Sequence, residues 1–201
     1  MELEVRDLTP GDLAAAGGVA GRALSDNPTF RWVRADDHLA RVGGCIDLFV
    51  GMMESMPGPQ LGAFVGRHVV GVAANAPPGT CVGEIVPVEM RTLPDDLDLT
   101  DPDSRALVVY SLLCGHDLAE RHWHVGPVSV EPGLQGLGIG GALLAPLCER
   151  MDEGGEVGWL ETDKPDNVVF YRRHGFDVVE EVPTTDGDHS FTTWFMRRDP
   201  R

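Results

Sequence analysis

The sequence is short of positive charge: 16 basic residues stand against 32 acidic ones, and the net charge is −16. A field of this sign repels phosphate backbones and anionic lipids, which argues against nucleic-acid binding and membrane-surface roles. It agrees with cationic small molecules as substrates, although an acidic surface often serves solubility alone. With 201 residues, 42% of them hydrophobic, the chain is long enough for one domain with its own core.

Paired cysteines are also missing. The four cysteines, Cys45, Cys81, Cys114 and Cys148, are far apart and form no CxxC motif. At least three of them lie in apolar, helix-like segments, where a cysteine behaves as a small hydrophobic residue. This spacing argues against a disulfide framework and against a zinc site.

Long apolar segments are missing as well. The first residues, MELEVR, have neither the basic flank nor the apolar run of a signal peptide. No uncharged stretch approaches the length that spans a membrane. These absences predict a cytoplasmic protein without membrane contact.

Hydrophobic periodicity predicts strands and helices in a mixed order, with strand–helix–strand units late in the chain. Strands are expected at 3–7, 61–65, 69–73, 123–130, 157–161, 176–182 and 190–196, and helices at 10–24, 36–53, 104–121, 136–152 and 166–174. Residues 76–103, rich in proline, glycine and aspartate, are expected to form a lid-like loop with one short helix near Val88. The order predicts an α+β fold, of the α/β type, around one mixed sheet.

The most informative segment runs from Val128 to Gly141. A strand leads into a turn with glycines at 136, 138, 140 and 141, and the turn opens directly into a helix. Glycines let a ligand approach the backbone closely. The unpaired N–H groups of the first helical turn, together with the helix dipole, favour an anion there. The segment therefore predicts a pyrophosphate site made mainly of backbone amides, which an acidic protein can still provide.

Two other phosphate-binding motifs fit this segment less well. A Walker A loop requires Gly-Lys-Ser/Thr, and the segment contains no lysine. A dinucleotide-binding fold would place GxGxxG near the start of the chain, whereas GxGxG lies two-thirds along it. A tight strand-to-helix turn without any ligand stays open as an alternative.

Residues 135–140, QGLGIG, resemble the Q/R-x-x-G-x-G/A motif of the GNAT superfamily of N-acetyltransferases. The strand before them, at 124–132, is similar to the central splayed strand of that family. Downstream, LET at 160–162, Asn167 and FYRRHGF at 170–176 resemble its second signature. The order and the separations agree as well.

Within this family the chain is most similar to the puromycin N-acetyltransferase-like, actinobacterial members. The likeness rests on the Asn27-Pro28 turn, the aromatic residues at 30–32, and Pro146 inside the helix that follows the glycine turn. A proline within a helix costs about 3 kcal/mol and is rarely accidental. The first half of the chain otherwise departs substantially from those members.

The resemblance implies a single acyl-CoA N-acyltransferase domain over residues 1–201, with its cofactor-binding core at 123–180 and acetyl-CoA as co-substrate. The backbone at 128–130 would pair with the pantetheine arm, and amides near Val130 would stabilise the oxyanion. The residues expected to hold the cofactor are Val128, Ser129, Val130, Gln135, Gly136, Leu137, Gly138, Ile139, Gly140, Gly141, Asn167 and Phe170.

The resemblance also implies that an amine attacks the thioester directly. Tyr171 is the expected general acid for the CoA thiolate, placed mid-helix between a cap at Asp166 and the stop at Gly175. Its structural alternative is a core tyrosine. Glu161, at the end of a strand beside the cofactor, is the expected general base, acting through water. Its alternative is a solvated or substrate-orienting carboxylate.

His122 and His124 lie on one face of a strand, which superficially resembles a metal site. No carboxylate or cysteine stands at a suitable spacing to complete such a site, so no metal is expected. His124, Phe30 and Trp32 are instead expected to line the acceptor pocket, with core packing as the alternative for the two aromatic residues.

The predicted function is therefore transfer of the acetyl group of acetyl-CoA to a primary amine of a small molecule, such as an aminoacyl-nucleoside-like amine. Acetylation of protein N-termini or lysines is one alternative, and it requires an open groove. A non-catalytic acetyl-CoA-binding regulatory module is another, and it has no need of Tyr171. The sequence leaves both a monomer and a homodimer open.

Overall fold

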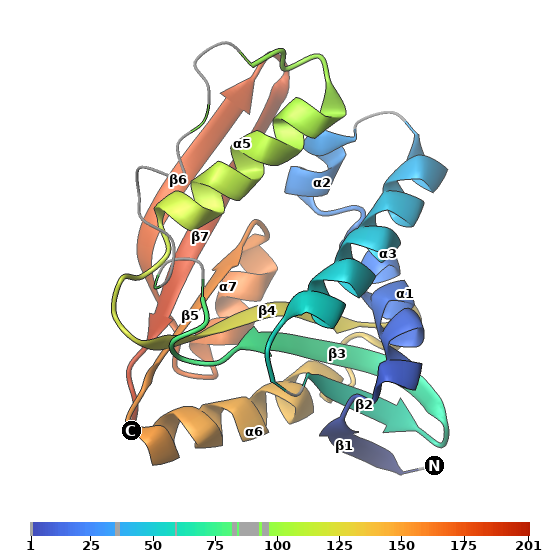
Figure 1. The fold of residues 1–201 in the computed structure, drawn as a ribbon, viewed down its shortest axis with the longest axis vertical. Helices are drawn as coiled ribbons and strands as arrows, with labels where there is room; N and C mark the ends of the chain where they lie inside the picture. Colours follow the sequence, from blue (N-terminus) through green and yellow to red (C-terminus); the bar gives the residue numbers. More distant parts are fainter. Residues whose placement is uncertain (1, 35–36, 59, 82–83, 85–92, 94–96) are drawn as a thin grey trace.

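The protein is described by a computed structural model covering residues 2–34, 37–58, 60–81, 84, 93 and 97–201 (Figure 1). The strands are β1 (Leu3–Asp7), β2 (Leu61–Val65), β3 (His68–Ala76), β4 (His122–Val130), β5 (Val157–Thr162), β6 (Asp177–Asp186) and β7 (His189–Arg198). The helices are α1 (Leu13–Leu24), α2 (Pro28–Val33), α3 (His38–Ser55), α5 (Pro102–Gly115), α6 (Ile139–Gly154) and α7 (Pro165–Arg172). Two 3-10 turns, η1 (Pro10–Asp12) and η3 (Pro132–Leu134), precede α1 and α6.

The described strands form one seven-stranded sheet in the order β1-β2-β3-β4-β5-β7-β6. β4 and β5 are parallel, and the other neighbouring pairs of described strands are antiparallel. The parallel pairing holds only from His122 to His124, although β4 continues to Val130. β4 therefore diverges from β5 in the middle of the sheet, and the predicted α+β fold with a splayed mixed sheet is confirmed.

Alternating side chains of the central strands bury the two faces of the sheet under different helices (Figure 1). On β3, Ala73 belongs to the hydrophobic cluster formed with α6 and α7. Its neighbours Val72 and Ala74 pack instead with α1 and α3 on the opposite face. At one end of β7, α2 and α5 meet in a third, smaller cluster. One face of the sheet thus carries α6 and α7, and the other faces α1 and α3.

Helices α1 and α3 lie very close together because two glycines of α1 face α3. A Cβ on Gly21 would overlap Ile46 Cγ1 and lie 2.8 Å from the Ile46 backbone nitrogen. We expect Gly21→Ala to push the helices apart and to lower the free energy of unfolding by about 2–3 kcal/mol. In the matched control Gly51→Ala, the new Cβ meets nothing within 4 Å, and alanine should stabilise α3 by about 0.5–1 kcal/mol. Urea unfolding measures both, and equal stabilities would contradict the close packing.

Turn geometry moves two helix boundaries away from their predicted positions. α5 ends at Gly115, not at residue 121, because the chain turns there and places Asp117 against the side chains of β4. α6 begins at Ile139, not at residue 136, because Gly136 and Gly138 have φ angles of 79° and 82°. These left-handed angles lie outside the α-helical region.

Two further expectations about helices need correction. The N-cap of α7 is Lys164, and Asp166 lies in the first helical turn, so the predicted Asp166 cap is wrong. Asp166 still lies where a negative charge interacts favourably with the helix dipole. The six-residue helix α2 was not predicted, although Asn27-Pro28 is a typical helix start, with proline at the first helical position.

The segment between β3 and α5 is described only in part. Val88, near which a short helix was expected, lies outside the described residues, as does most of the expected lid. In the part of the chain that the structure describes, no helix combines the length and the apolar composition needed to cross a membrane.

Candidate functional site

The glycine-rich segment forms an open turn between β4 and α6. Gln135 Nε2 donates to the Val130 carbonyl oxygen at 3.2 Å, which ties the turn to the end of the strand. A Cβ on Gly136 or Gly138 would meet nothing within 4 Å. Their left-handed backbone, and not crowding, is what requires glycine, and the space around the turn is open to a ligand.

The N-terminus of α6 opens onto this turn. The amide of Ala142 makes a helical hydrogen bond to the Gly138 carbonyl oxygen at 3.0 Å. The amides at 139–141 therefore have no acceptor within the helix. Because α6 is 16 residues long, its dipole adds partial positive charge at this end. The arrangement suits a phosphate group, as the sequence predicts.

The divergence of β4 from β5 exposes one backbone edge of β4. Residues 125–130 pair with β3 on one side, from Val125 opposite Asn75 to Val130 opposite Gly71. On the other side, the pairing with β5 has already ended at His124. Ser129 is buried, and its Oγ has no hydrogen-bond partner among the described residues. This edge can therefore pair with an extended ligand, as expected for residues 128–130.

Tyr171 lies in α7 and is buried in the hydrophobic cluster that also contains Val125 of β4 and Leu160 of β5. Its ring centroid is 5.1 Å from that of Phe170 and 6.0 Å from that of Phe176. Burial raises the pKa of the Tyr171 hydroxyl well above its ordinary value, and the nearby Glu161 carboxylate raises it further. The phenol therefore stays protonated at neutral pH, which is the state that a proton donor needs.

Phe170 and Asn167 extend the site from the same helix. A Cβ on Gly140 would lie 3.1 Å from Phe170 Cζ, so the phenylalanine ring packs closely against the first turn of α6. Asn167 Nδ2 donates to Thr162 Oγ1 at 3.0 Å, which orients the amide at the end of β5. The structure thus brings Phe170 to the glycine turn and attaches Asn167 to the strand that carries Glu161.

Glu161 and His124 are joined by a hydrogen bond between β5 and β4. His124 Nε2 donates to Glu161 Oε2 at 3.0 Å. Glu161 points to the face opposite α6, because its neighbour Leu160 belongs to the α6 cluster and side chains alternate along a strand. His124 lies on the same face, because it pairs with residue 159 of β5, which also neighbours Leu160. The Glu161 side chain is 22% exposed, so one carboxylate is both oriented and accessible to solvent.

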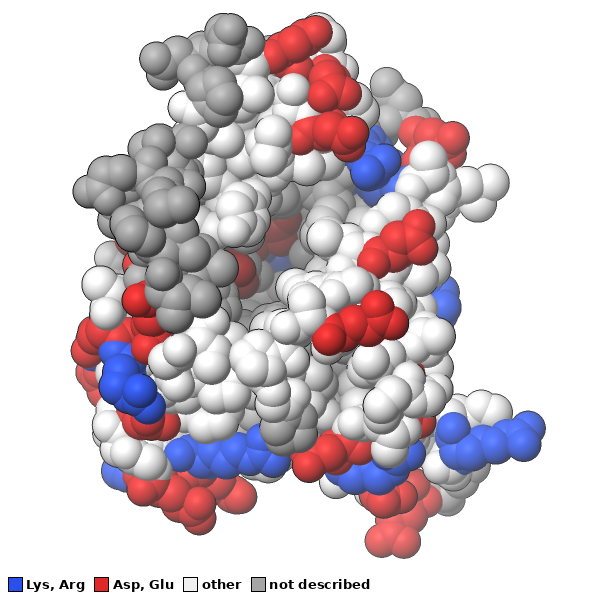
Figure 2. All heavy atoms as spheres, viewed as in Figure 1, with Lys and Arg blue, Asp and Glu red and all other residues white. Residues whose placement is uncertain are grey.

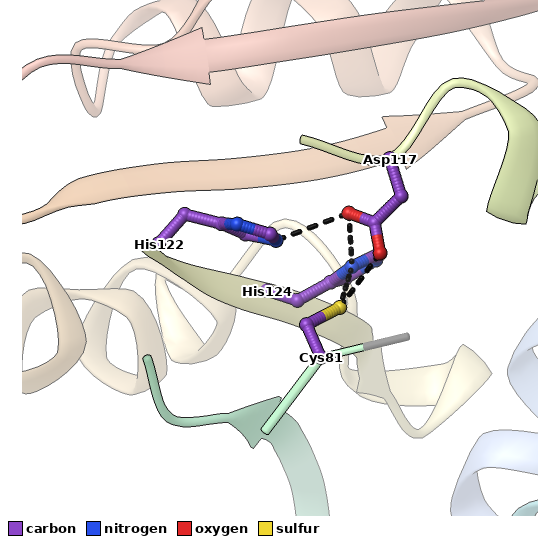
Figure 3. A group of neighbouring side chains, drawn as sticks. All are labelled: Cys81, Asp117, His122 and His124. Carbon is purple, nitrogen blue, oxygen red and sulfur yellow. Dashed lines mark hydrogen bonds and ion pairs between the residues drawn. The ribbon is translucent and has the colours of Figure 1, made fainter. Parts of the chain in front are cut away.

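His124 also belongs to a cluster of four side chains, Cys81, Asp117, His122 and His124 (Figure 3). Cys81 follows β3, Asp117 lies in the turn after α5, and the two histidines come from β4. Their ligand atoms all lie within 4.8 Å of one another. Tertiary folding thus brings a cysteine and a carboxylate from distant segments to the histidine pair, which spacing along the sequence did not indicate.

In this cluster, the neighbouring acidic groups raise the pKa of the histidines by more than burial lowers it. Burial alone would lower the pKa of His122, but its contacts with Asp117 and Cys81 and its hydrogen bond with a backbone carbonyl raise it to about 10. Burial also opposes a raised pKa for His124, yet Glu161, Asp117 and Cys81 raise it well above its ordinary value. The histidines hold the pKa of Asp117 below its usual range despite burial, and likewise lower that of the Cys81 thiol.

The face that carries Glu161 is hollowed. Figure 2 shows a depression near the middle of this view, between α5 and α3, with acidic side-chain atoms visible inside it. The described surface around it is mostly uncharged in this view, with acidic groups at several places farther out and a basic group at the upper right. Such a hollow favours a cationic ligand over an anionic one.

The other two residues expected in the acceptor pocket pack into hydrophobic clusters. Phe30 meets Phe49 edge-on at 5.7 Å between ring centroids, with α1 and α3. Trp32 is 2% exposed, packs on Phe191 at 5.9 Å, and donates from Nε1 to Asp186 Oδ2 at 3.0 Å. The structure gives both aromatic residues a packing role and shows no described contact of either with His124.

Cys81 and Asp117, which meet the two histidines, were not singled out from the sequence, and neither was Asp163. Asp163, between β5 and α7, accepts from Asn27 Nδ2 at 3.0 Å and from the Thr29 amide at 2.8 Å, which holds α2 near the site. The sequence carried one signal for Cys81, because it alone among the cysteines lies outside an apolar helix-like segment. No spacing rule links it to Asp117, 36 residues later.

Comparison with known proteins adds to this geometry. Residues 25–176 match the family model described as the acetyltransferase (GNAT) family. A structure of the histone acetyltransferase HPA2 and related acetyltransferase from Corynebacterium glutamicum is 21% identical, with a TM-score of 0.69, covering 100% of this chain and 98% of that one. The polyamine N-acetyltransferase of Drosophila melanogaster gives 12% identity and a TM-score of 0.66, with 98% and 100% covered. The acetyltransferase yncA from Salmonella typhimurium, solved with acetyl-CoA, gives 16% and 0.58, with 100% and 95% covered.

Proposed function

Because the chain belongs to the acetyltransferase (GNAT) family and is an acetyl-CoA-dependent N-acetyltransferase, we propose that it acetylates the primary amine of a small molecule. The observation that carries the proposal is the placement of two groups on either side of β5, where β4 diverges from it. Tyr171 is buried with Leu160 of β5, and Glu161 is the next residue of that strand. Burial and the Glu161 carboxylate raise the pKa of the phenol, which stays protonated. An acid and a base are thus held near each other, where an amine and a thioester can meet.

The placement of acetyl-CoA follows from the backbone. The amides of the first turn of α6, at 139–141, and the glycines of the turn receive the pyrophosphate. The open edge of β4 at 128–130 pairs with the pantetheine arm, and its amides stabilise the oxyanion of the tetrahedral intermediate. Phe170, which packs on Gly140, and Asn167 border the cofactor on the α7 side.

The reaction then proceeds by direct attack. The amine nitrogen bonds to the thioester carbonyl carbon, and the carbon–sulfur bond breaks when the tetrahedral intermediate collapses. Tyr171 gives its proton to the departing CoA thiolate, and Glu161 accepts the proton that the amine loses, directly or through one water. One proton leaves the amine and one reaches CoA, so the overall transfer is balanced.

A small cationic amine is the substrate class that the acidic surface favours. The net charge is −16, and acidic atoms lie inside the hollow in Figure 2. His124, fixed by Glu161, borders the place where this amine would bind. The resemblance of the Asn27-Pro28 turn and of Pro146 to puromycin N-acetyltransferase-like members suggests an amine of the aminoacyl-nucleoside kind. The Drosophila neighbour is named for polyamines.

The test is release of free CoA thiol from acetyl-CoA with a panel of small primary amines, including puromycin and polyamines. Turnover with one class of these amines supports the proposal. Turnover with peptide N-termini or lysines alone would instead indicate a protein acetyltransferase. Tight acetyl-CoA binding without thiol release for any acceptor would indicate a binding module.

Glu161→Gln is expected to lower kcat/KM for the accepted amine by about 100-fold at neutral pH, since a general base contributes roughly 10²–10⁴. The amide keeps an acceptor for His124 but cannot take up the amine proton. Glu153→Gln, an exposed change on α6, is the matched control. Thiol release at limiting amine concentration measures both variants, and similar values for the two would remove Glu161 from the mechanism.

A further inference from the structure

The cluster of Cys81, Asp117, His122 and His124 has a feature that hydrogen bonding within it does not explain (Figure 3). His122 is fully buried, and its Nε2 lies 3.0 Å from Asp117 Oδ1. The contact nevertheless lacks hydrogen-bond geometry, and Nε2 has no hydrogen-bond partner among the described residues. Nε2 therefore meets Asp117 only through an ion-pair contact without hydrogen-bond geometry. A buried nitrogen in this state is rare, which points to a further ligand of this atom.

Both imidazoles turn their second nitrogen toward the same carboxylate, and a bound metal ion would take the place of the proton on that nitrogen. His122 Nδ1 lies 2.8 Å from the Glu120 carbonyl oxygen, which can only accept, so Nδ1 carries the proton. His124 Nε2 donates in the same way to Glu161 Oε2. The remaining nitrogens, Nε2 of His122 and Nδ1 of His124, face Asp117 at 3.0 and 3.3 Å. Histidines that bind metals show this pattern, in which the second nitrogen donates to a carbonyl or carboxylate.

The two other members add negative charge. Cys81 Sγ lies 2.8 Å from Asp117 Oδ2 and 3.0 Å from His124 Nδ1. The Cys81 residue is 6% exposed and the Asp117 side chain 2% exposed. A thiolate and a carboxylate with two neutral imidazoles carry a charge of −2, which a divalent cation neutralises. Buried charge needs such compensation.

We propose that Cys81, Asp117, His122 and His124 bind one zinc ion. One sulfur, two nitrogens and one oxygen form a donor set that suits Zn²⁺ and does not suit Mg²⁺ or Ca²⁺, which prefer oxygen ligands. A tetrahedral zinc ion, with bonds of about 2.0–2.3 Å, holds neighbouring ligand atoms about 3.3–3.7 Å apart. The contacts of 2.8–3.3 Å are shorter than these separations, and the widest pairs, within 4.8 Å, are longer, so the four side chains adjust in both directions to hold the ion.

The ion joins side chains from three parts of the chain. It connects the segment after β3, the turn after α5, and the strand β4, on the face that carries Glu161. Through the hydrogen bond from His124, it also restrains the Glu161 carboxylate. The zinc site therefore crosslinks these segments beside the hollow in Figure 2. It is distinct from the glycine turn that serves the cofactor.

The experiment uses the full chain without a polyhistidine tag, stripped of metal with a chelator. Titration with Zn²⁺ alone, in competition with a chromophoric chelator, should show one ion per chain. Co²⁺ should give the visible bands of a tetrahedral site and a thiolate-to-cobalt charge-transfer band. Cys81→Ala should abolish that band and weaken Zn²⁺ binding by at least about 100-fold, since even outer partners of metal ligands cost 10–100-fold.

Cys45→Ala is the matched control, because Cys45 is a buried cysteine of α3 that takes no part in the cluster. It should keep both the stoichiometry and the charge-transfer band. Cys81→Ser, which preserves size, replaces the alanine variant if that variant does not fold. The zinc and cobalt measurements do not depend on acetyl transfer, so their outcome is independent of the proposed function.

Three results would overturn the zinc site. The first is the absence of stoichiometric Zn²⁺ binding by the stripped wild-type chain. The second is an unchanged cobalt charge-transfer band in the Cys81 variants. The third is an acetyl thioester on Cys81 after incubation with acetyl-CoA, seen by mass spectrometry. That product would make Cys81, His124 and Glu161 a nucleophile with its base, in place of a metal site.

Discussion

Tyr171→Phe is expected to lower kcat about 100- to 1,000-fold while the Kd for acetyl-CoA changes less than about twofold, because general acid catalysis contributes roughly 10²–10⁴. The variant keeps the ring that packs against Phe170 and Phe176 and removes only the hydroxyl. That hydroxyl has a raised pKa and is held in its protonated form. Thiol release at saturating acetyl-CoA measures kcat, and calorimetric titration measures the Kd.

The matched control is Tyr110→Phe, since Tyr110 is the other of the two tyrosines and is 55% exposed on α5. It should leave kcat within about twofold of the wild type. A Tyr171→Phe protein with near wild-type kcat would show that CoA departs without a proton from this residue. Tyr171 would then be a core residue, as the packing alternative holds.

The second large effect is expected at Gly138, in the glycine turn. Valine at this position has to leave the left-handed region or accept strain of about 1–2 kcal/mol or more, because its φ angle is 82°. A turn that relaxes away from this conformation no longer presents the amides of the first turn of α6. We expect Gly138→Val to raise the Kd for acetyl-CoA about 5- to 30-fold, which is what 1–2 kcal/mol corresponds to. Calorimetric titration measures this change.

Gly133→Ala serves as the control, because Gly133 lies in η3 of the same segment, has no positive φ angle, and offers space for a Cβ. Its affinity for acetyl-CoA should equal that of the wild type. The Tm of both variants separates two outcomes for Gly138→Val. A lower Tm with unchanged affinity would mean that the turn keeps its shape at the cost of strain. Binding of acetyl-CoA would then not require glycine at position 138.

The sequence by itself determined the parts of this protein that depend on short-range rules. The strands and most helices follow from hydrophobic periodicity, which acts over a few residues. The glycine turn was predicted from glycines clustered between a strand and a helix, and the structure shows that two of them, Gly136 and Gly138, have positive φ angles. The fold and the acetyl-CoA cofactor followed from the same local motifs. Helix ends were less predictable, as at Gly115, because a turn also depends on what its residues contact.

Only the tertiary structure decided which distant side chains meet. Cys81 and Asp117 are 36 residues apart, and His124 meets Glu161 across 37 residues, so no local spacing rule relates them. The divergence of β4 from β5 was expected only from the family resemblance at 124–132, because periodicity within either strand does not contain how two strands pair. Trp32 packs against Phe191 for the same reason. Such contacts depend on how the whole chain packs, because free energy is gained by burying partners that only the completed fold brings together.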